Sequence, residues 1–140
     1  MKKWMLLSFA LILILGGTSC NAQNGKKHEV KAEVASKVEV YYFHFTRRCM
    51  TCNAVETESK KAVEAMYPNL VKSGKITFKA FNLDDATCKT VAERCGAEGQ
   101  SLLVIGSGKR IDLTSQGFQY AVNNPDKLKA ELKKAIDPLI

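Results

Sequence analysis

The stretch Val38–Met66 reads VEVYYFHFTRRCMTCNAVETESKKAVEAM, and it decides the fold of the chain. Its first eight residues are mostly β-branched or aromatic, which is the pattern of a strand buried on both faces. After the cysteine motif, apolar and small residues recur at the spacing of one helix face, with charged residues on the other. The sequence therefore predicts a buried strand that leads, through two cysteines, into a long amphipathic helix.

The Cys49-Met50-Thr51-Cys52 motif at the start of this helix favours thiol–disulfide chemistry. The first sulfur would lie beside unpaired amide N–H groups and the positive end of the helix dipole, which stabilise a thiolate. A thiolate is the attacking species in disulfide exchange. We therefore predict that Cys49 is the nucleophile and that Cys52 resolves the mixed disulfide. Arg47 and Arg48 add positive charge and are predicted to tune the thiol pKa. The alternatives are half of a zinc or copper site, or a structural bridge.

Length and composition indicate one globular domain. The chain has 140 residues, of which 46% are hydrophobic and 25% are charged, so it can form a sizeable core. The formal net charge is +7, and it falls by two, to +5, without Lys2 and Lys3. This surplus is spread along the chain and forms no basic patch with interleaved aromatic residues. We therefore expect no nucleic-acid partner.

The first residues have the pattern of an export signal. Two lysines precede an apolar run, Trp4–Leu15, which is too short to span a bilayer as a helix. Small residues then end in Cys20, which resembles a bacterial lipoprotein signal over residues 1–19, with the lipid on Cys20. The alternative is an ordinary signal peptide cut near Ala22. Both predict export to the periplasm, where disulfides persist, and the first predicts a lipid anchor in a bacterial membrane.

The segment that follows is predicted to be a tether. Residues 20–36 are polar and charged with no aromatic side chain, so we expect a lipid anchor followed by a flexible linker. The domain itself is predicted to occupy residues 37–140.

The remaining elements are predicted from periodicity and turn residues. Strands are expected over 75–83, 101–105 and 109–113, with helices over 88–95 and from Asn124 onward, and with a short helix or ordered loop over 114–122. The predicted order is β-α-β-α-β-β-α. We expect three parallel strands joined by crossover helices and a last antiparallel strand, which is an α/β sandwich.

This order, with Cys-x-x-Cys opening the first domain helix, resembles the thioredoxin-like family over about residues 38–140. The resemblance implies an α/β/α sandwich with a mixed four-stranded central sheet and a redox-active pair with Cys49 exposed. It also implies that the segment from Cys95 to Gln100 lies near the active-site surface. Asn82-Leu83-Asp84 looks like the Asn-Ile-Asp that ends the second strand in thioredoxins.

Residues 42–52, YFHFTRRCMTC, are similar to a narrower group of small exported proteins from Bacteroidetes-type bacteria. That group is named the nitrophenyl compound nitroreductase subunit ArsF family. No Gly-x-Gly-x-x-Gly motif follows a strand in this sequence, so we expect neither a flavin nor a nicotinamide, and no other cofactor.

The chain departs from the thioredoxin pattern around the motif. Arg48 stands where the family usually has tryptophan, and Met50-Thr51 replaces Gly-Pro. Phe43 takes the place of the family's buried carboxylate. This leaves His44 and Glu56 as candidates for proton transfer.

A second departure concerns the loop before the third strand. Gln100 and Ser101 stand where the family has its cis-proline and the residue after it, and the resemblance makes them a loop that faces the substrate. A cis bond before a non-proline residue costs about 3 kcal/mol. We therefore predict a trans peptide at Gln100.

Cys88 and Cys95 are additional to the thioredoxin pattern. Seven residues apart on one helix, they would be separated by about 10 Å along its axis, too far for a disulfide unless the helix end frays. Three alternatives remain open: a second disulfide, buried thiols without a role, or participation with the first pair in binding a soft metal.

Together these features predict an exported, membrane-tethered, monomeric thiol–disulfide oxidoreductase. Its partners would be protein thiols and disulfides, or a redox protein of the membrane. One alternative is a module that binds zinc, copper(I) or arsenite through its cysteines. The other is a non-catalytic thioredoxin-fold subunit of an exported complex.

Overall fold

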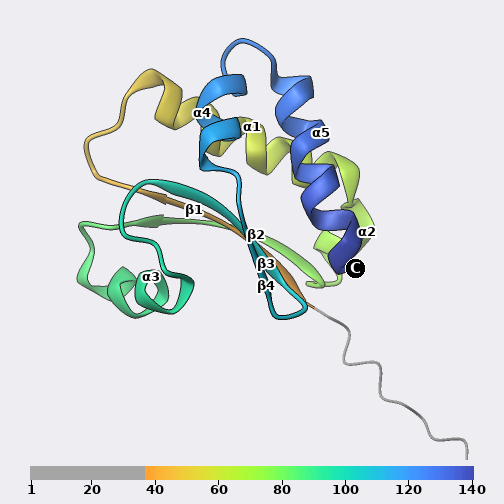
Figure 1. The fold of residues 1–140 in the computed structure, drawn as a ribbon, viewed down its shortest axis with the longest axis horizontal. Coiled ribbons are helices and arrows are strands. Elements are labelled where there is room, and N and C mark those ends of the chain that lie inside the picture. The colour runs from red at the N-terminus through yellow and green to blue at the C-terminus, as the bar shows by residue number, and fades with distance from the viewer. Residues whose placement is uncertain (1–36) are drawn as a thin grey trace, which may run out of the picture. The chain divides into compact units, whose positions relative to one another are not determined.

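The computed structural model describes residues 37–140, which form a four-stranded sheet with helices on both faces (Figure 1). The strand order is β2-β1-β3-β4. β1 pairs in parallel with β2 and antiparallel with β3, and β3 pairs antiparallel with β4. The predicted α/β class and mixed four-stranded sheet are therefore confirmed. The strands are β1 (Val38–His44), β2 (Ile76–Asn82), β3 (Ser101–Gly106) and β4 (Lys109–Asp112).

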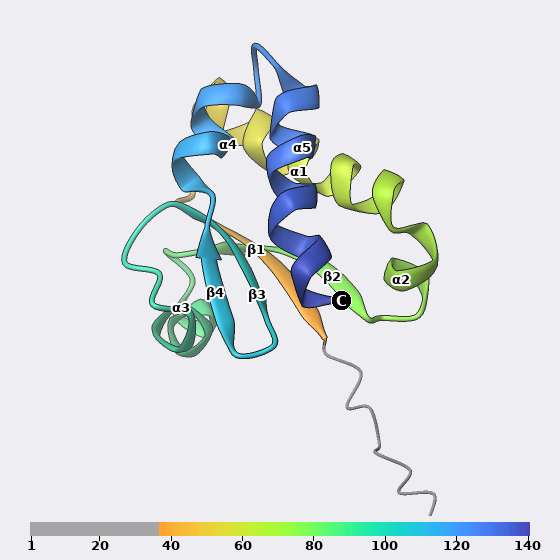
Figure 2. The ribbon, with the colours of Figure 1, turned by 45° about the vertical axis from the view of Figure 1, so that its right-hand side comes forward.

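The helices divide unequally between the two faces of the sheet. In both ribbon views α1, α4 and α5 lie on one face, and α3 lies on the other (Figures 1 and 2). The helical segments are α1 (Met50–Met66), α2 (Pro68–Lys72), η1 (Ala86–Cys88), α3 (Lys89–Cys95), α4 (Thr114–Tyr120), α5 (Pro125–Ile136) and η2 (Asp137–Leu139). Residues 114–120 are thus a helix, the first of the two predicted alternatives.

β1 lies in the middle of the sheet and is buried on both faces, as its composition predicts. Val40 and Tyr42 belong to the large cluster shared with α1, α4 and α5. Tyr41 and Phe43 belong to a second cluster, shared with α3. Each buried side chain of this size stabilises the fold by about 1.5–3 kcal/mol. Because successive side chains of β1 point to opposite faces, both helical layers pack against this one strand.

The predicted direction of the third strand is wrong. β3 begins opposite Phe43, near the end at which β1 and β2 finish, and runs antiparallel to β1. The connection explains this direction. A seven-residue strand spans about 23 Å, whereas the seven-residue helix α3 advances by only about 10 Å. The helix alone therefore does not carry the chain back to the opposite end of the sheet, and the chain re-enters at the end where β2 finishes.

Residue types that favour helix ends stand at three of the helix boundaries. Pro68 is the first residue of α2 and is separated from the last residue of α1, Met66, by Tyr67 alone. Gly96 ends α3 with a φ of 62°, a left-handed conformation that glycine adopts without steric cost. The Asn124 side chain accepts a hydrogen bond from the backbone N–H of Lys127 and so caps α5.

The predictions for the start of the chain lie outside the described residues. They are the signal peptide over 1–19, the lipid on Cys20 and the tether over 20–36. Within residues 37–140, no helix is both long enough and apolar enough to cross a membrane.

One polar side chain is enclosed in the core side of α1. Ser59 is fully buried, and its Oγ has no hydrogen-bond partner among residues 37–140. Ala62 lies on the same buried side of the helix. A buried hydroxyl without a partner keeps its desolvation cost, so Ser59 weakens the packing of α1.

We expect Ser59→Ala to raise the free energy of unfolding by about 1 kcal/mol, because it removes this hydroxyl and improves helix propensity. Ala62→Ser is the matched control and should lower the free energy of unfolding by a similar amount. Urea denaturation followed by circular dichroism measures both. A loss of stability in Ser59→Ala would mean that the hydroxyl is paired in solution.

Candidate functional site

The cysteine pair lies at the junction between β1 and α1. Cys49 is the N-cap of α1, and its sulfur accepts a hydrogen bond from the backbone N–H of Cys52 at 3.1 Å. The two residues form a disulfide, with their Cα atoms 5.1 Å apart. Such a pair at a helix start is compatible with a Cys-x-x-Cys redox motif.

The two sulfur-bearing residues differ in accessibility. Cys49 is exposed, whereas Cys52 is 3% exposed and faces the protein interior. The apolar side chains of Met50 and Phe45 are 78% and 40% exposed on the same loop and helix start. An attacking thiolate can therefore reach the sulfur of Cys49 but not that of Cys52.

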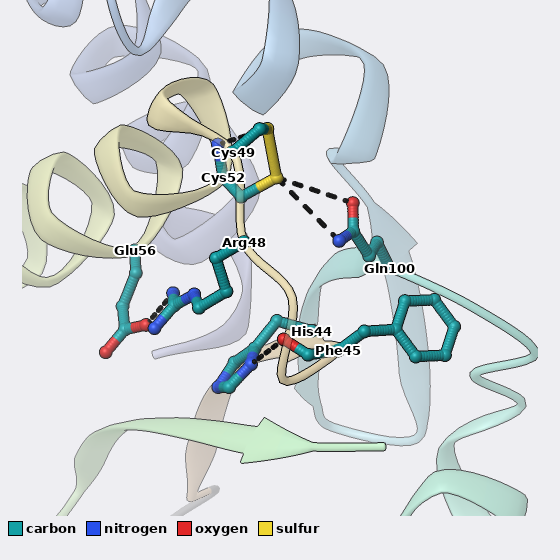
Figure 3. The surroundings of a disulfide bond; sticks show 7 residues. All are labelled: His44, Phe45, Arg48, Cys49, Cys52, Glu56 and Gln100. Carbon is teal, nitrogen blue, oxygen red and sulfur yellow. Dashed lines mark hydrogen bonds and ion pairs between the residues drawn. A yellow bond between two sulfur atoms is a disulfide. The ribbon is translucent and has the colours of Figure 1, made fainter. Parts of the chain in front are cut away.

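Gln100 reaches the disulfide from the loop between α3 and β3 (Figure 3). Its Nε2 lies 3.7 Å and its Oε1 3.8 Å from the Sγ of Cys52. The predicted trans peptide is confirmed, since residues 37–140 contain no cis peptide bond. The structure thus brings Gln100 to the cysteine pair, as the resemblance implies.

Ser101 is buried in the sheet. It is the first residue of β3, is only 7% exposed, and pairs with Phe43 in the sheet. Its Oγ donates a hydrogen bond to the carbonyl of Gly99 at 3.1 Å. Sheet pairing therefore buries Ser101, whereas the resemblance places it in a loop that faces the substrate. Its hydroxyl instead holds the loop that carries Gln100.

The predicted role of Arg48 is altered by an ion pair. Its guanidinium binds the carboxylate of Glu56 (Figure 3). The guanidinium also lies 5.9 Å from the centre of the Tyr42 ring. The positive charge is thus compensated locally, which leaves less of it to stabilise a thiolate. Arg47 is exposed on the loop.

Neither candidate for proton transfer contacts the disulfide. Glu56 is held by Arg48, and in Figure 3 its carboxylate points away from the sulfur atoms. His44 ends β1, and its Nδ1 donates a hydrogen bond to the carbonyl of Phe45 at 3.0 Å. In Figure 3 its ring likewise lies away from the disulfide. The position of the family's buried carboxylate is filled by Phe43, which is fully buried.

The loop before Cys49 is anchored to the end of β2. The backbone N–H of Thr46 donates to Asp84 Oδ2 at 2.7 Å, and Asn82 Nδ2 donates to Thr46 Oγ1 at 2.9 Å. The bond from the Thr46 N–H is the main cause that lowers the pKa of Asp84. Sequence reasoning did not assign this role. The sequence feature that could have indicated this role is the triplet Asn82-Leu83-Asp84, which looks like the Asn-Ile-Asp that ends the second strand in thioredoxins.

The loop that carries Gln100 is fixed by Arg110 on β4. Arg110 Nε donates to the carbonyl of Cys95 at 2.7 Å, and Nη2 donates to that of Gly96 at 3.3 Å. These carbonyls are left unpaired by the end of α3. No local sequence signal points to Arg110, because its partners lie 14 and 15 residues earlier in the chain.

Cys88 and Cys95 are free thiols, so the suggested second disulfide is absent. Both are buried against Tyr41, Phe43 and Leu103, on the α3 face of the sheet. They do not form a disulfide because the helix stays ordered through Cys95, which keeps the two cysteines too far apart along its axis. Burial is the main cause that raises the pKa of the Cys88 thiol, which keeps it protonated. Within residues 37–140, no group of three or more His, Cys, Asp or Glu side chains could hold a metal ion.

Comparisons with known proteins add little. No family model matches the chain, and no curated protein matches it. A solved structure described as "Structure of a malarial protein" is 20% identical, with a TM-score of 0.45. The match covers 71% of this chain and 98% of the other. A likeness at this level carries no conclusion about fold or function.

We expect Asp84→Ala to release the loop before Cys49, because the Thr46 N–H loses its acceptor. Hydrogen exchange at the Thr46 amide should become about tenfold faster. Asp85→Ala is the matched control, since Asp85 accepts from Thr87 instead and should leave Thr46 unchanged. Equal effects of the two variants would contradict an anchoring role for Asp84.

The same anchor has a defined pH dependence. The pKa of Asp84 is lowered in the folded protein, so its bond is present above the carboxyl's ordinary pKa and is lost as the pH falls through the lower folded value.

Proposed function

We propose that this protein is a thiol–disulfide oxidoreductase with a thioredoxin-like fold, and that Cys49 and Cys52 are its redox-active pair. The observation that carries the proposal is the unequal placement of the two residues at the start of α1. Cys49 is exposed at the N-cap, and Cys52 is buried one turn later. Disulfide exchange needs this asymmetry, because one sulfur must meet the partner and the other must remain to resolve the complex.

The topology supports the thioredoxin-like identity that the sequence suggests. The order β2-β1-β3-β4, with a parallel β1–β2 pair and an antiparallel β3–β4 hairpin, fits that fold with helices on both faces. Gln100 at the disulfide fits the expected position of the loop before β3. Membership of the narrower exported group named for a nitrophenyl compound nitroreductase subunit is part of the same proposal and rests on residues 42–52.

The site performs the exchange in two steps. A partner thiolate attacks Cys49 Sγ and forms a mixed disulfide, while the electron pair of the Cys49–Cys52 bond moves to Cys52 Sγ. A second partner thiolate then displaces Cys49 Sγ, so the partner is oxidised by two electrons and the pair is reduced. The N–H of Cys52 and the start of α1 stabilise negative charge on Cys49, which helps it leave.

We propose further that the protein works outside the cytoplasm as a monomer attached to a bacterial membrane by a lipid on Cys20. Its partners would be protein thiols and disulfides or a membrane redox protein. The exposed Met50 and Phe45 beside Cys49 give such a partner an apolar surface to contact.

The proposal is tested by redox titration of the purified full-length protein with reduced and oxidised glutathione, read by thiol alkylation and mass spectrometry. The native pair should exchange two electrons reversibly. Cys49→Ser should abolish exchange. In Cys52→Ser, the Cys49 thiolate attacks oxidised glutathione and releases one glutathione thiolate, and the mixed disulfide should accumulate because no Cys52 thiolate displaces the second glutathione. Cys95→Ala is the matched control and should leave exchange unchanged, since Cys95 is buried on the α3 face.

A different result would overturn the oxidoreductase proposal. If the reduced protein held one tightly bound soft metal ion on Cys49 and Cys52 and did not exchange with glutathione, metal binding would be the better account. Native mass spectrometry of the same samples reads that outcome directly.

A further inference from the structure

The carboxamide of Gln100 contacts the buried sulfur of the pair with both of its polar atoms. Nε2 lies 3.7 Å and Oε1 3.8 Å from Cys52 Sγ (Figure 3). An amide is both a donor and an acceptor, and the two atoms lie at nearly the same distance from the sulfur. The side chain can therefore serve a sulfur that carries a negative charge and one that carries a proton.

Cys52 needs such a partner when the disulfide opens. The residue is 3% exposed, so water solvates little of the charge that reaches its sulfur. An uncompensated buried charge is costly, and a hydrogen-bond donor lowers that cost. Among the described residues, Gln100 is the only one whose side chain donates a hydrogen bond to Cys52 Sγ, from Nε2, because a disulfide sulfur carries no proton to donate to Oε1. Arg48 is bound to Glu56, and His44 to its neighbour's carbonyl.

The loop that carries this amide is also held in place. Arg110 binds the carbonyls of Cys95 and Gly96 at the start of the loop, and Ser101 binds that of Gly99 at its end. A donor on a fixed loop loses less conformational freedom when charge develops beside it than one on a mobile loop would.

We propose that Gln100 is a catalytic residue that stabilises Cys52 in both of its reduced states, and this inference rests on the proposed function. When a partner thiolate bonds to Cys49 Sγ, the Cys49–Cys52 bond breaks and its electron pair moves to Cys52 Sγ. Gln100 Nε2–H donates to the resulting thiolate. When that thiolate takes up a proton released by the partner thiols, the S–H donates to Gln100 Oε1.

Two consequences follow for the chemistry. The bond from Nε2–H to the thiolate is charge-assisted and therefore stronger than the bond from the thiol to Oε1, so the pKa of Cys52 falls. Cys52 becomes a better leaving group, because a thiol of lower pKa leaves faster. The reduced pair is stabilised relative to the disulfide, which makes the pair more oxidising. A carboxylate at position 100 would serve only the protonated thiol, and an apolar side chain would serve neither form.

The test compares Gln100→Leu and Gln100→Glu with the native full-length protein. We expect Gln100→Leu to shift the equilibrium with glutathione about tenfold toward the disulfide, which corresponds to a potential about 30 mV more negative. Gln100→Glu should show a larger shift above the pKa of Cys52 than below it, because it keeps the acceptor and loses the donor. In a Cys49→Ala background, thiolate absorbance should show the pKa of Cys52 raised in both variants.

Glu98→Gln is the matched control, because Glu98 lies exposed on the same loop and should leave both readouts unchanged. Circular dichroism identifies any variant that fails to fold. If one Gln100 variant fails to fold, the redox potential is measured in the other Gln100 variant. If both Gln100→Leu and Gln100→Glu have the native redox potential, the role of Gln100 is overturned and the proposed function is not. A native pair that does not exchange with glutathione at all would instead overturn the proposed function.

Discussion

The site depends on the burial of β1 on both faces. Val40 and Tyr42 fix the strand against one helical layer, and Tyr41 and Phe43 fix it against the other. The strand therefore ends at a defined point, and the loop after it is held by hydrogen bonds to the end of β2. Because α1 starts a few residues later, this loop fixes where the first turn of the helix presents its cysteines.

The first turn of α1 then makes two chemically equal residues unequal. Cys49 lies at the N-cap, where a backbone N–H points at its sulfur and a partner can reach it. Cys52 lies one turn later, buried beside Gln100. The ion pair between Arg48 and Glu56 compensates the positive charge of Arg48, so less of that charge acts on the two sulfur atoms. Oriented N–H groups of the backbone and of an amide therefore point at the two sulfur atoms, whereas the Arg48 guanidinium binds a carboxylate instead.

The parts that could be predicted from sequence are those encoded within a few consecutive residues. The buried run of β1, the periodicity of α1 and the end signals at Pro68, Gly96 and Asn124 are all local. The direction of β3 could not be read this way, because it depends on how far the connection between strands reaches. The contacts of Arg110 and Arg48 were also missed, since each pairs with residues that no local pattern links to it.

The same sheet that supports the redox pair isolates the other two cysteines from it. Cys88 and Cys95 pack beneath β1 on the α3 face, whereas α1 covers the opposite face. Burial holds the Cys88 thiol protonated, and a protonated thiol is a poor nucleophile. Thiol chemistry at the cysteine motif can therefore proceed without scrambling between the two pairs. The aromatic residues of β1 that build the core thus also form the barrier between them.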